Sequence, residues 1–149
     1  MTLYYFAYGS NMNPERMKER GINFEKREVG ILLDAKLVFN KKVKGIEGRT
    51  VANILPEAGS IVEGALYTTT EEDISKLDIF EGVPHHYQRY TKEIQLSTLE
   101  KIEAVVYIAN EEVQGEGMPI KEYLEHLLVG KDILSREYFE RLTQVQTRE

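Results

Sequence analysis

The sequence has no cysteine, which excludes disulfide bonds, thiolate metal ligands and a catalytic thiol. It also lacks an excess of basic residues, because 19 Lys and Arg against 25 Asp and Glu give a net charge of −6. A nucleic-acid or anionic-membrane partner would call for a basic patch, so neither is expected. No uncharged run approaches the roughly 20 residues of a membrane helix, and residues 3–8 are too short a run for an export signal. A cytoplasmic protein is therefore expected.

Several common catalytic motifs are missing as well. The chain has no phosphate-binding loop with its lysine and no glycine fingerprint of dinucleotide-binding folds. Ser10 does not lie in a Gly-x-Ser-x-Gly elbow, which argues against a Ser-His-Asp hydrolase. His85 and His86 are neighbours, and adjacent residues of a strand point to opposite faces. With so few ligands at hand, no metal site is expected.

What is present is typical of one folded domain, which we predict over residues 1–149. Of the residues, 42% are apolar and 30% charged. A chain of about 150 residues buries roughly 68–70% of its unfolded surface, so its core needs no disulfide or metal. The pattern predicts strands over residues 3–8, 28–40 (with a bend near Asp34), 49–55, 60–68, 87–96 and 102–109.

Capping signals predict four helices between and after these strands. Asn13 with Pro14 begins the first helix, Thr69 with Glu72 forms a capping box for the second, Gly130 stops the third, and Ser135 caps the last. Strands and helices do not alternate regularly, which disfavours a doubly wound parallel sheet. We therefore predict an α+β fold in which helices flank a curled or barrel-like, largely antiparallel mixed sheet.

The segment of residues 8–12, Tyr-Gly-Ser-Asn-Met, joins the first apolar run to the first predicted helix. A glycine at a strand end permits positive φ, and successive amides in such a turn can form an anion-binding concavity. The following helix start adds positive partial charge when its amides face the same way. A purely structural turn would explain the same residues, so this pattern leaves both interpretations open.

A second candidate is Glu81, which has Ile79, Phe80 and Val83 close by in sequence. A carboxylate held among apolar groups has a raised pKa, which suits proton transfer near neutral pH. The alternative is an exposed glutamate near a helix end. Tyr87 is either a hydrogen-bonding aromatic of the same site or a core residue with a satisfied hydroxyl.

Taken together, these segments resemble the gamma-glutamyl cyclotransferase family. Residues 8–12 match its "YGSN" loop followed by Leu or Met, and residues 64–67 match its glycine-x-apolar-aromatic strand. Leu77-Asp78, then Glu81-Gly82-Val83 and Tyr87, match the segment of its catalytic glutamate. Tyr123, seven residues before Gly130, matches its C-terminal helix. The resemblance extends from about Leu3 to about Leu142.

Two details refine this resemblance. Asn11 and the preceding Phe6-Ala7 look closer to gamma-glutamyl cyclotransferase proper than to the glutathione-specific branch, which usually reads "GYGSL". The plant avirulence-induced branch and the gamma-glutamylamine enzymes usually read "YGTL". Ile133-Leu134-Ser135 replaces the Gly-Leu-Pro of many members, with little consequence because Pro and Ser both suit a helix start.

The resemblance implies an enzyme that releases 5-oxoproline from a gamma-glutamyl amide. The substrate's own α-amine attacks its γ-carbonyl, so neither a catalytic thiol nor a cofactor or metal is required. Glu81 would be the general acid/base. Loop amides would donate to the oxyanion or to the substrate carboxylate. The implied substrate-binding residues are Tyr8, Gly9, Ser10, Asn11, Met12, Tyr87 and Tyr123.

Two alternatives keep the same fold. The substrate could instead be a gamma-glutamylamine or a gamma-glutamyl-protected metabolite. From another class, the cavity could hold a small carboxylate or amine without turnover, although a pure binder has no need of a proton acceptor such as Glu81. The sequence leaves the oligomeric state open, with a homodimer among the options.

Overall fold

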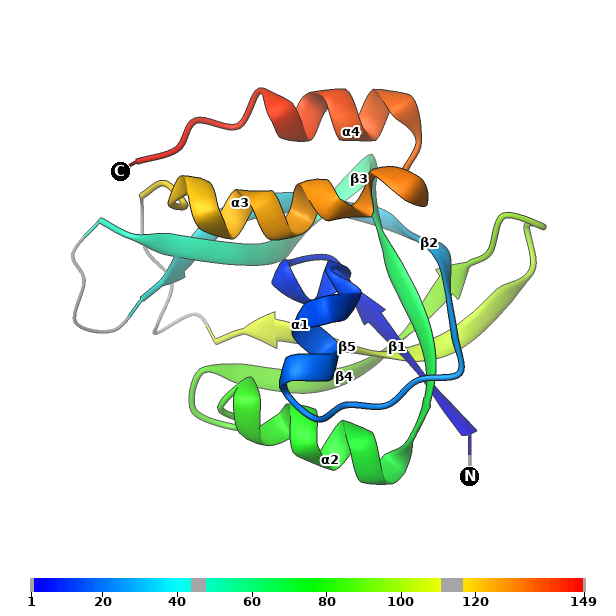
Figure 1. Cartoon of the computed structure of the whole chain (residues 1–149). Helices are drawn as coiled ribbons and strands as arrows, with labels where there is room; N and C mark the ends of the chain where they lie inside the picture. Colours follow the sequence, from blue (N-terminus) through cyan, green and yellow to red (C-terminus); the bar gives the residue numbers. More distant parts are fainter. Residues whose placement is uncertain (1, 44–47, 111–116, 149) are drawn as a thin grey trace.

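The computed structural model describes residues 2–43, 48–110 and 117–148, and its five strands close into a barrel in the order β1-β3-β2-β4-β5 (Figure 1). All neighbouring strands are antiparallel except β1 and β5, which close the barrel in parallel with Tyr5 opposite Val105. The predicted α+β fold with a barrel-like, largely antiparallel mixed sheet is thus confirmed. The strands are β1 (Thr2–Ala7), β2 (Lys26–Lys42), β3 (Thr50–Thr70), β4 (Tyr87–Gln95) and β5 (Lys101–Ala109).

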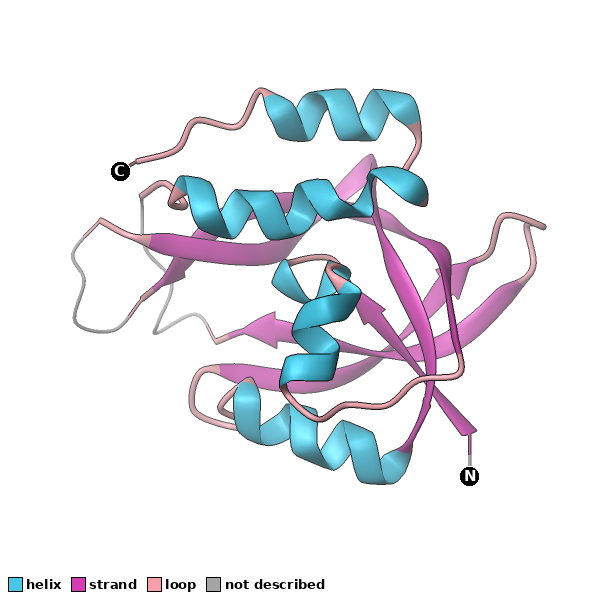
Figure 2. Cartoon of the chain, viewed as in Figure 1, coloured by secondary structure: helices cyan, strands magenta, loops and turns pink. Residues whose placement is uncertain are grey.

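Helices flank this barrel on several sides (Figure 2). Helices α3 and α4 lie together over one side, and α2 lies on the opposite side of the view in Figure 1. Among the described residues, no helix has the length and apolar character needed to cross a membrane. The helical elements are η1 (Ser10–Met12), α1 (Pro14–Glu19), α2 (Glu71–Phe80), α3 (Lys121–Leu128), η3 (Val129–Asp132) and α4 (Arg136–Thr143).

Two of the predicted helix starts are confirmed by their capping hydrogen bonds. The Asn13 side chain accepts a hydrogen bond from the Glu15 amide at α1, and the Ser135 side chain accepts one from the Tyr138 amide at α4. A short polar side chain at this position satisfies an amide that the first turn leaves without a partner.

The second helix begins one residue later than predicted. Thr70, not Thr69, caps α2 by accepting from the Asp73 amide at 3.3 Å. Thr69 is buried instead, and its hydroxyl donates to the Asn23 carbonyl. The third helix ends close to Gly130, as predicted: α3 stops at Leu128, and the chain passes through Gly130 as the 3-10 turn η3.

Strand β3 is one long element where the sequence predicts two strands. Its pairing with β2 shifts at the predicted turn, from Leu33 opposite Ile61 to Ala35 opposite Pro56. Asp34 has a φ of 58°, and its carboxylate accepts a hydrogen bond from the Gly59 amide at 3.0 Å. The predicted bend near Asp34 is thus confirmed, and the turn residues form an irregularity inside one strand rather than a break between two.

The core consists of two packed clusters. One contains strand residues together with Tyr8, and its largest fully buried members include Phe6, Leu66 and Ile94. The other joins the strands to all four α-helices and includes Met17 of α1 and Leu127 of α3. Because both α1 and the end of α2 are packed into this second cluster, the loops at their ends are held in fixed positions relative to the barrel.

Candidate active site

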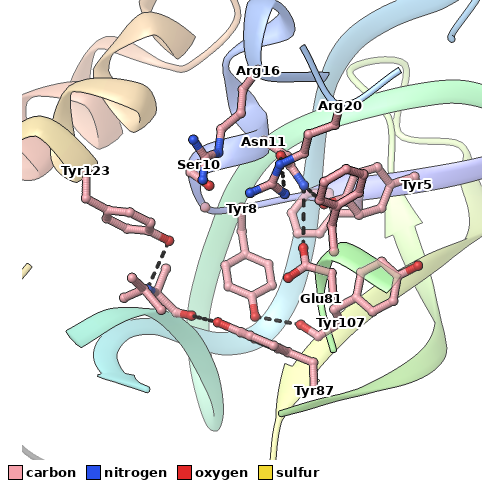
Figure 3. Close-up of a pocket in the computed structure, with 15 residues that line it drawn as sticks. Tyr5, Tyr8, Ser10, Asn11, Arg16, Arg20, Glu81, Tyr87, Tyr107 and Tyr123 are labelled. Carbon is pink, nitrogen blue, oxygen red and sulfur yellow. Dashed lines mark hydrogen bonds between the residues drawn. The ribbon is translucent and has the colours of Figure 1, made fainter. Parts of the chain in front are cut away.

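A cavity of about 210 Å³ opens where the end of β1 and η1 face the end of α2 (Figure 3). It brings the loop at residues 8–11 together with Glu81, although Asn11 and Glu81 are 70 residues apart in sequence. The volume lies below the roughly 300–1,000 Å³ of typical ligand pockets, which suits a small metabolite. The lining residues are Tyr5, Phe6, Tyr8, Gly9, Ser10, Asn11, Arg16, Arg20, Val51, Ala52, Phe80, Glu81, Tyr87, Tyr107 and Tyr123.

The loop after β1 is a 3-10 turn in which the Met12 amide donates to the Gly9 carbonyl at 3.0 Å. The first amides of such a turn have no carbonyl to bond within it. The Ser10 amide faces the Tyr123 hydroxyl, and Ser10 and Asn11 both lie at the cavity wall, where a ligand can accept from their amides. Gly9 has a φ of −113°, so it does not use the positive φ that a glycine permits. Position 9 favours glycine for another reason, which is that the Tyr123 side chain packs closely against it. A Cβ at this position would lie 2.9 Å from the Tyr123 hydroxyl oxygen.

The Asn11 side chain connects the loop to Glu81. Its amide nitrogen donates to the Tyr5 hydroxyl at 3.0 Å and lies 3.4 Å from Glu81 Oε1. Its amide oxygen accepts from Arg20 Nη1 at 3.2 Å. The residue is buried, and its backbone carbonyl accepts from the Tyr67 hydroxyl at 2.6 Å. Asn11 therefore contributes its side chain as well as its amide to the site.

Met12 does not line the cavity, contrary to the sequence-based prediction. Its side chain is fully buried in the core and fills the space beside Gly130. Its carbonyl accepts a hydrogen bond from Arg27 Nη2 at 2.9 Å. The 3-10 turn directs this side chain away from the cavity, so Met12 anchors the loop.

Glu81 caps the C-terminal end of α2 and faces the loop. Burial raises the pKa of its carboxyl to about 7, and the positive charges of Arg20 and Arg16 partly oppose that rise. The sequence-based reason for a raised pKa is wrong in one respect. Ile79 is 80% exposed and absent from the cavity wall, so it does not bury this carboxyl, whereas Phe80 lines the cavity together with Glu81.

Three predicted tyrosines line the cavity, and backbone hydrogen bonds fix each hydroxyl. Tyr8 donates to the Tyr107 carbonyl at 2.6 Å, and Tyr87 donates to the Ala52 carbonyl at 2.9 Å. The Tyr123 hydroxyl instead accepts from the Ala52 amide at 3.1 Å. Its own proton therefore remains available to a ligand.

Burial makes the hydroxyls of these three tyrosines still harder to ionise than an ordinary phenol. It raises the pKa of Tyr8 and of Tyr87 well above the ordinary value, and the charge of Glu81 adds to both shifts. Burial also raises the pKa of Tyr123 to about 12, although amides at Ala52 and Ser10 lower it. The tyrosines can thus orient a ligand and donate hydrogen bonds, but they are poor bases.

Four polar residues of the cavity were not predicted from the sequence: Arg16, Arg20, Tyr5 and Tyr107. The sequence could have predicted the two arginines, because residues four apart on a helix lie on the same face and this helix directly follows the loop. Arg20 also lies over the Phe80 ring, with 5.0 Å from its Cζ to the ring centroid. Tyr5 and Tyr107 could not be separated from core aromatics by sequence pattern.

The histidine pair does not form a metal centre within the described parts of the chain, where no group of three His, Cys, Asp or Glu residues could hold an ion. His85 and His86 lie in the turn before β4, not in the strand. The buried Lys41 approaches His86 Nδ1 at 3.4 Å and lies 5.9 Å from the centroid of the Tyr87 ring. This basic group packs behind the wall of the cavity.

Comparisons with known proteins bear on this arrangement. A family model described as "Gamma-glutamyl cyclotransferase, AIG2-like" matches residues 5–125, a range that includes the loop, Glu81 and Tyr123. Searching curated protein sequences gives no significant match. A solved structure named "Gamma-glutamyl cyclotransferase" has a TM-score of 0.87 at 25% identity, covering 100% of this chain and 90% of that chain.

Two further solved structures are similar over nearly all of this chain. A human protein described as uncharacterized has a TM-score of 0.87 at 26% identity, covering 99% of this chain and 90% of that one. YkqA from Bacillus subtilis has a TM-score of 0.83 at 23% identity and shares the fold, with 99% of this chain covering 56% of that one.

Proposed function

The chain belongs to the gamma-glutamyl cyclotransferase, AIG2-like family, and from that premise we propose that it is an enzyme that cyclises gamma-glutamyl amides. The products would be 5-oxoproline and a free amine or amino acid. The observation that carries the proposal is Glu81, a carboxyl with a pKa of about 7 that faces the loop at residues 8–11 across one small cavity.

The reaction needs a base because the nucleophile is the α-amine of the substrate, which is mostly protonated at neutral pH. Glu81 accepts a proton from this ammonium, and the freed amine attacks the γ-carbonyl to close a five-membered ring. The same carboxyl then returns the proton to the nitrogen that leaves. A pKa near 7 suits both transfers, because it leaves each protonation state substantially populated at neutral pH.

The remaining task is to hold the substrate folded and to stabilise the oxyanion that forms on the γ-carbonyl. Positioning the amine against the carbonyl supplies much of the rate through proximity. The Ser10 and Asn11 amides and the Tyr123 hydroxyl are donors at the cavity wall that can serve the oxyanion. Tyr8 and Tyr87 already donate to backbone carbonyls, so they shape the cavity instead.

The direct test is to incubate the purified chain with gamma-glutamyl-alanine, other gamma-glutamyl amino acids, glutathione and gamma-glutamylamines, and to measure 5-oxoproline by mass spectrometry. We expect equimolar release of 5-oxoproline and the free amine from at least one class. If only the gamma-glutamylamines released 5-oxoproline, the chain would be assigned as a gamma-glutamylamine cyclotransferase. If no member of this panel released 5-oxoproline, the proposed reaction would be rejected.

A further inference from the structure

Two arginines point into the cavity from one face of α1, and neither forms an ion pair in the described structure. Figure 3 shows the Arg20 guanidinium beside Asn11 and the Arg16 guanidinium beside Ser10, and both residues line the cavity. Arg20 makes a hydrogen bond with a neutral group, the Asn11 amide oxygen, at 3.2 Å. Arg16 Nε is buried and has no hydrogen-bond partner within the residues that the structure describes.

This pair makes the cavity cationic in an acidic protein. The whole chain has a net charge of −6, yet two guanidinium groups face one carboxyl among the lining residues. Arg16 and Arg20 also repel each other, and burial together with the Arg20 charge lowers the pKa of Arg16. Two like charges that face a single carboxyl, Glu81, favour an anionic ligand, and guanidinium groups match carboxylates through paired hydrogen bonds.

The position of the pair relative to Glu81 indicates which carboxylate it would bind. Asn11 lies between Glu81 and Arg20, with its side-chain nitrogen 3.4 Å from Glu81 Oε1 and its side-chain oxygen 3.2 Å from Arg20 Nη1. In a gamma-glutamyl compound the α-ammonium and the α-carboxylate are attached to the same carbon atom. A substrate whose ammonium meets Glu81 therefore has its α-carboxylate within a few bonds of that contact, on the arginine side.

We propose that Arg16 and Arg20 bind the α-carboxylate of the gamma-glutamyl group, a step that rests on the proposed function. The loop amides at Ser10 and Asn11 are then left for the oxyanion. The site thus selects ligands that have a free α-carboxylate next to the amine, and the departing amine faces the wall formed by Ala52, Tyr87 and Tyr123.

Binding of the proposed product, 5-oxoproline, can be measured without any reaction, because this compound has no leaving group. 5-Oxoproline and 2-pyrrolidinone differ by the carboxylate alone, so their relative affinity reports the contribution of that group. We would titrate the wild-type chain with each compound and follow amide chemical shifts by NMR. The expected result is that 5-oxoproline binds about tenfold or more tightly than 2-pyrrolidinone, since charge-assisted pairs are the stronger hydrogen bonds.

Variants then assign this preference to residues. Arg16→Gln and Arg20→Gln should each weaken 5-oxoproline binding severalfold or more while leaving 2-pyrrolidinone binding unchanged. Lys18→Gln is the matched control, because Lys18 lies on the same helix with an exposed side chain and is absent from the cavity wall. It should retain the full preference.

The outcomes separate this inference from the proposed reaction. Equal binding of the two compounds by the wild-type chain, or no binding of 5-oxoproline, would overturn the inference. So would arginine variants that keep the full preference, because the carboxylate would then be held by the loop amides. A chain that prefers 5-oxoproline as expected but releases none from any substrate would overturn the reaction and leave this binding site standing.

Discussion

Glu63 is buried in the protein, Glu81 is half-buried at the candidate site, and the surroundings of the two carboxyls differ in kind. Glu63 of β3 is 5% exposed and accepts two short hydrogen bonds from Ser135, one from its amide at 2.7 Å and one from its hydroxyl at 2.6 Å. Glu81 has one long contact, 3.4 Å from the Asn11 amide nitrogen, and two nearby arginines that do not pair with it. Glu63 joins α4 to the barrel through these hydrogen bonds, whereas the carboxyl of Glu81 makes no comparably short hydrogen bond in the described structure.

The cavities beside these two residues reinforce the contrast. Glu63 lies at a cavity of about 610 Å³ between α4 and the β2–β3 ribbon, and Glu81 lies at one of about 210 Å³. Size alone would favour the larger cavity. Chemistry favours the smaller one, because an acidic group that is buried without full hydrogen bonding has a shifted pKa and can exchange protons with a ligand.

The largest expected difference is in kcat, when each of the two glutamates is replaced by glutamine. Glu81→Gln keeps the shape but cannot accept a proton, so we expect kcat for 5-oxoproline release to fall by about 10²–10⁴-fold. Glu63→Gln should keep the wild-type kcat per folded molecule. Steady-state kinetics on both variants tests this difference. Equal loss of kcat in the two variants would contradict a catalytic role specific to Glu81.

The second effect concerns stability and should be confined to Glu63. Glu63→Gln replaces a charged acceptor of two hydrogen bonds with a neutral amide, at a cost of about 2–3 kcal/mol in the free energy of unfolding. For a chain of this size that corresponds to a fall in Tm of roughly 4–12 °C. Thermal unfolding followed by circular dichroism measures it, and an unchanged Tm would mean that Glu63 does not hold α4 in place.

Glu81→Gln should have the opposite effect on stability, and the effect should depend on pH. The pKa of Glu81 rises from 4.5 to about 7 in the folded state, so folding binds this proton and stability is lost as pH rises through that interval. Removing the charge should raise the free energy of unfolding by about 1–2 kcal/mol at pH 8. The gain should vanish at pH 4. Urea unfolding at both pH values tests this, and an equal gain at both would contradict the raised pKa of Glu81 as its cause.

The smallest effects are expected from two serines, Ser135 beside Glu63 and Ser10 in the loop that faces Glu81. The Ser135 hydroxyl donates to Glu63 and accepts from the Tyr138 amide, so Ser135→Ala should cost about 1–2 kcal/mol of stability. The Ser10 hydroxyl has no hydrogen bond within the described structure, and its amide is the useful donor. Ser10→Ala should lower kcat/KM by less than about tenfold and leave Tm unchanged. Complete loss of turnover in a folded Ser10→Ala protein would show that the hydroxyl itself takes part.

Much of the fold could be predicted because it depends on local signals. The caps at Asn13 and Ser135 and the bend at Asp34 each arise from residues close together in sequence. The continuity of β3 could not be predicted, because pairing with β2 holds the strand together across Pro56 and Gly59 despite their turn character. Closure of the barrel between Tyr5 and Val105 is likewise a long-range contact that no local pattern encodes.

The candidate site was predicted in outline, through the loop and Glu81, with parts of the reasoning wrong. Met12 was assigned to the cavity because it lies next to Asn11, but the 3-10 turn sends its side chain into the core. The raised pKa of Glu81 was attributed to Ile79, Phe80 and Val83, but Ile79 is 80% exposed and does not line the cavity. Sequence proximity misled in both cases because side-chain direction depends on backbone conformation.

The central claim is that Glu81, unlike an ordinary surface glutamate, titrates near neutral pH. The most direct measurement is NMR titration of the intact chain labelled with ¹³C at glutamate side-chain carboxyl carbons, with the Glu81 resonance assigned by its disappearance in Glu81→Gln. We expect a pKa of about 7 for this carboxyl. A Glu81 resonance that titrates near 4.5 in the folded protein would contradict the claim.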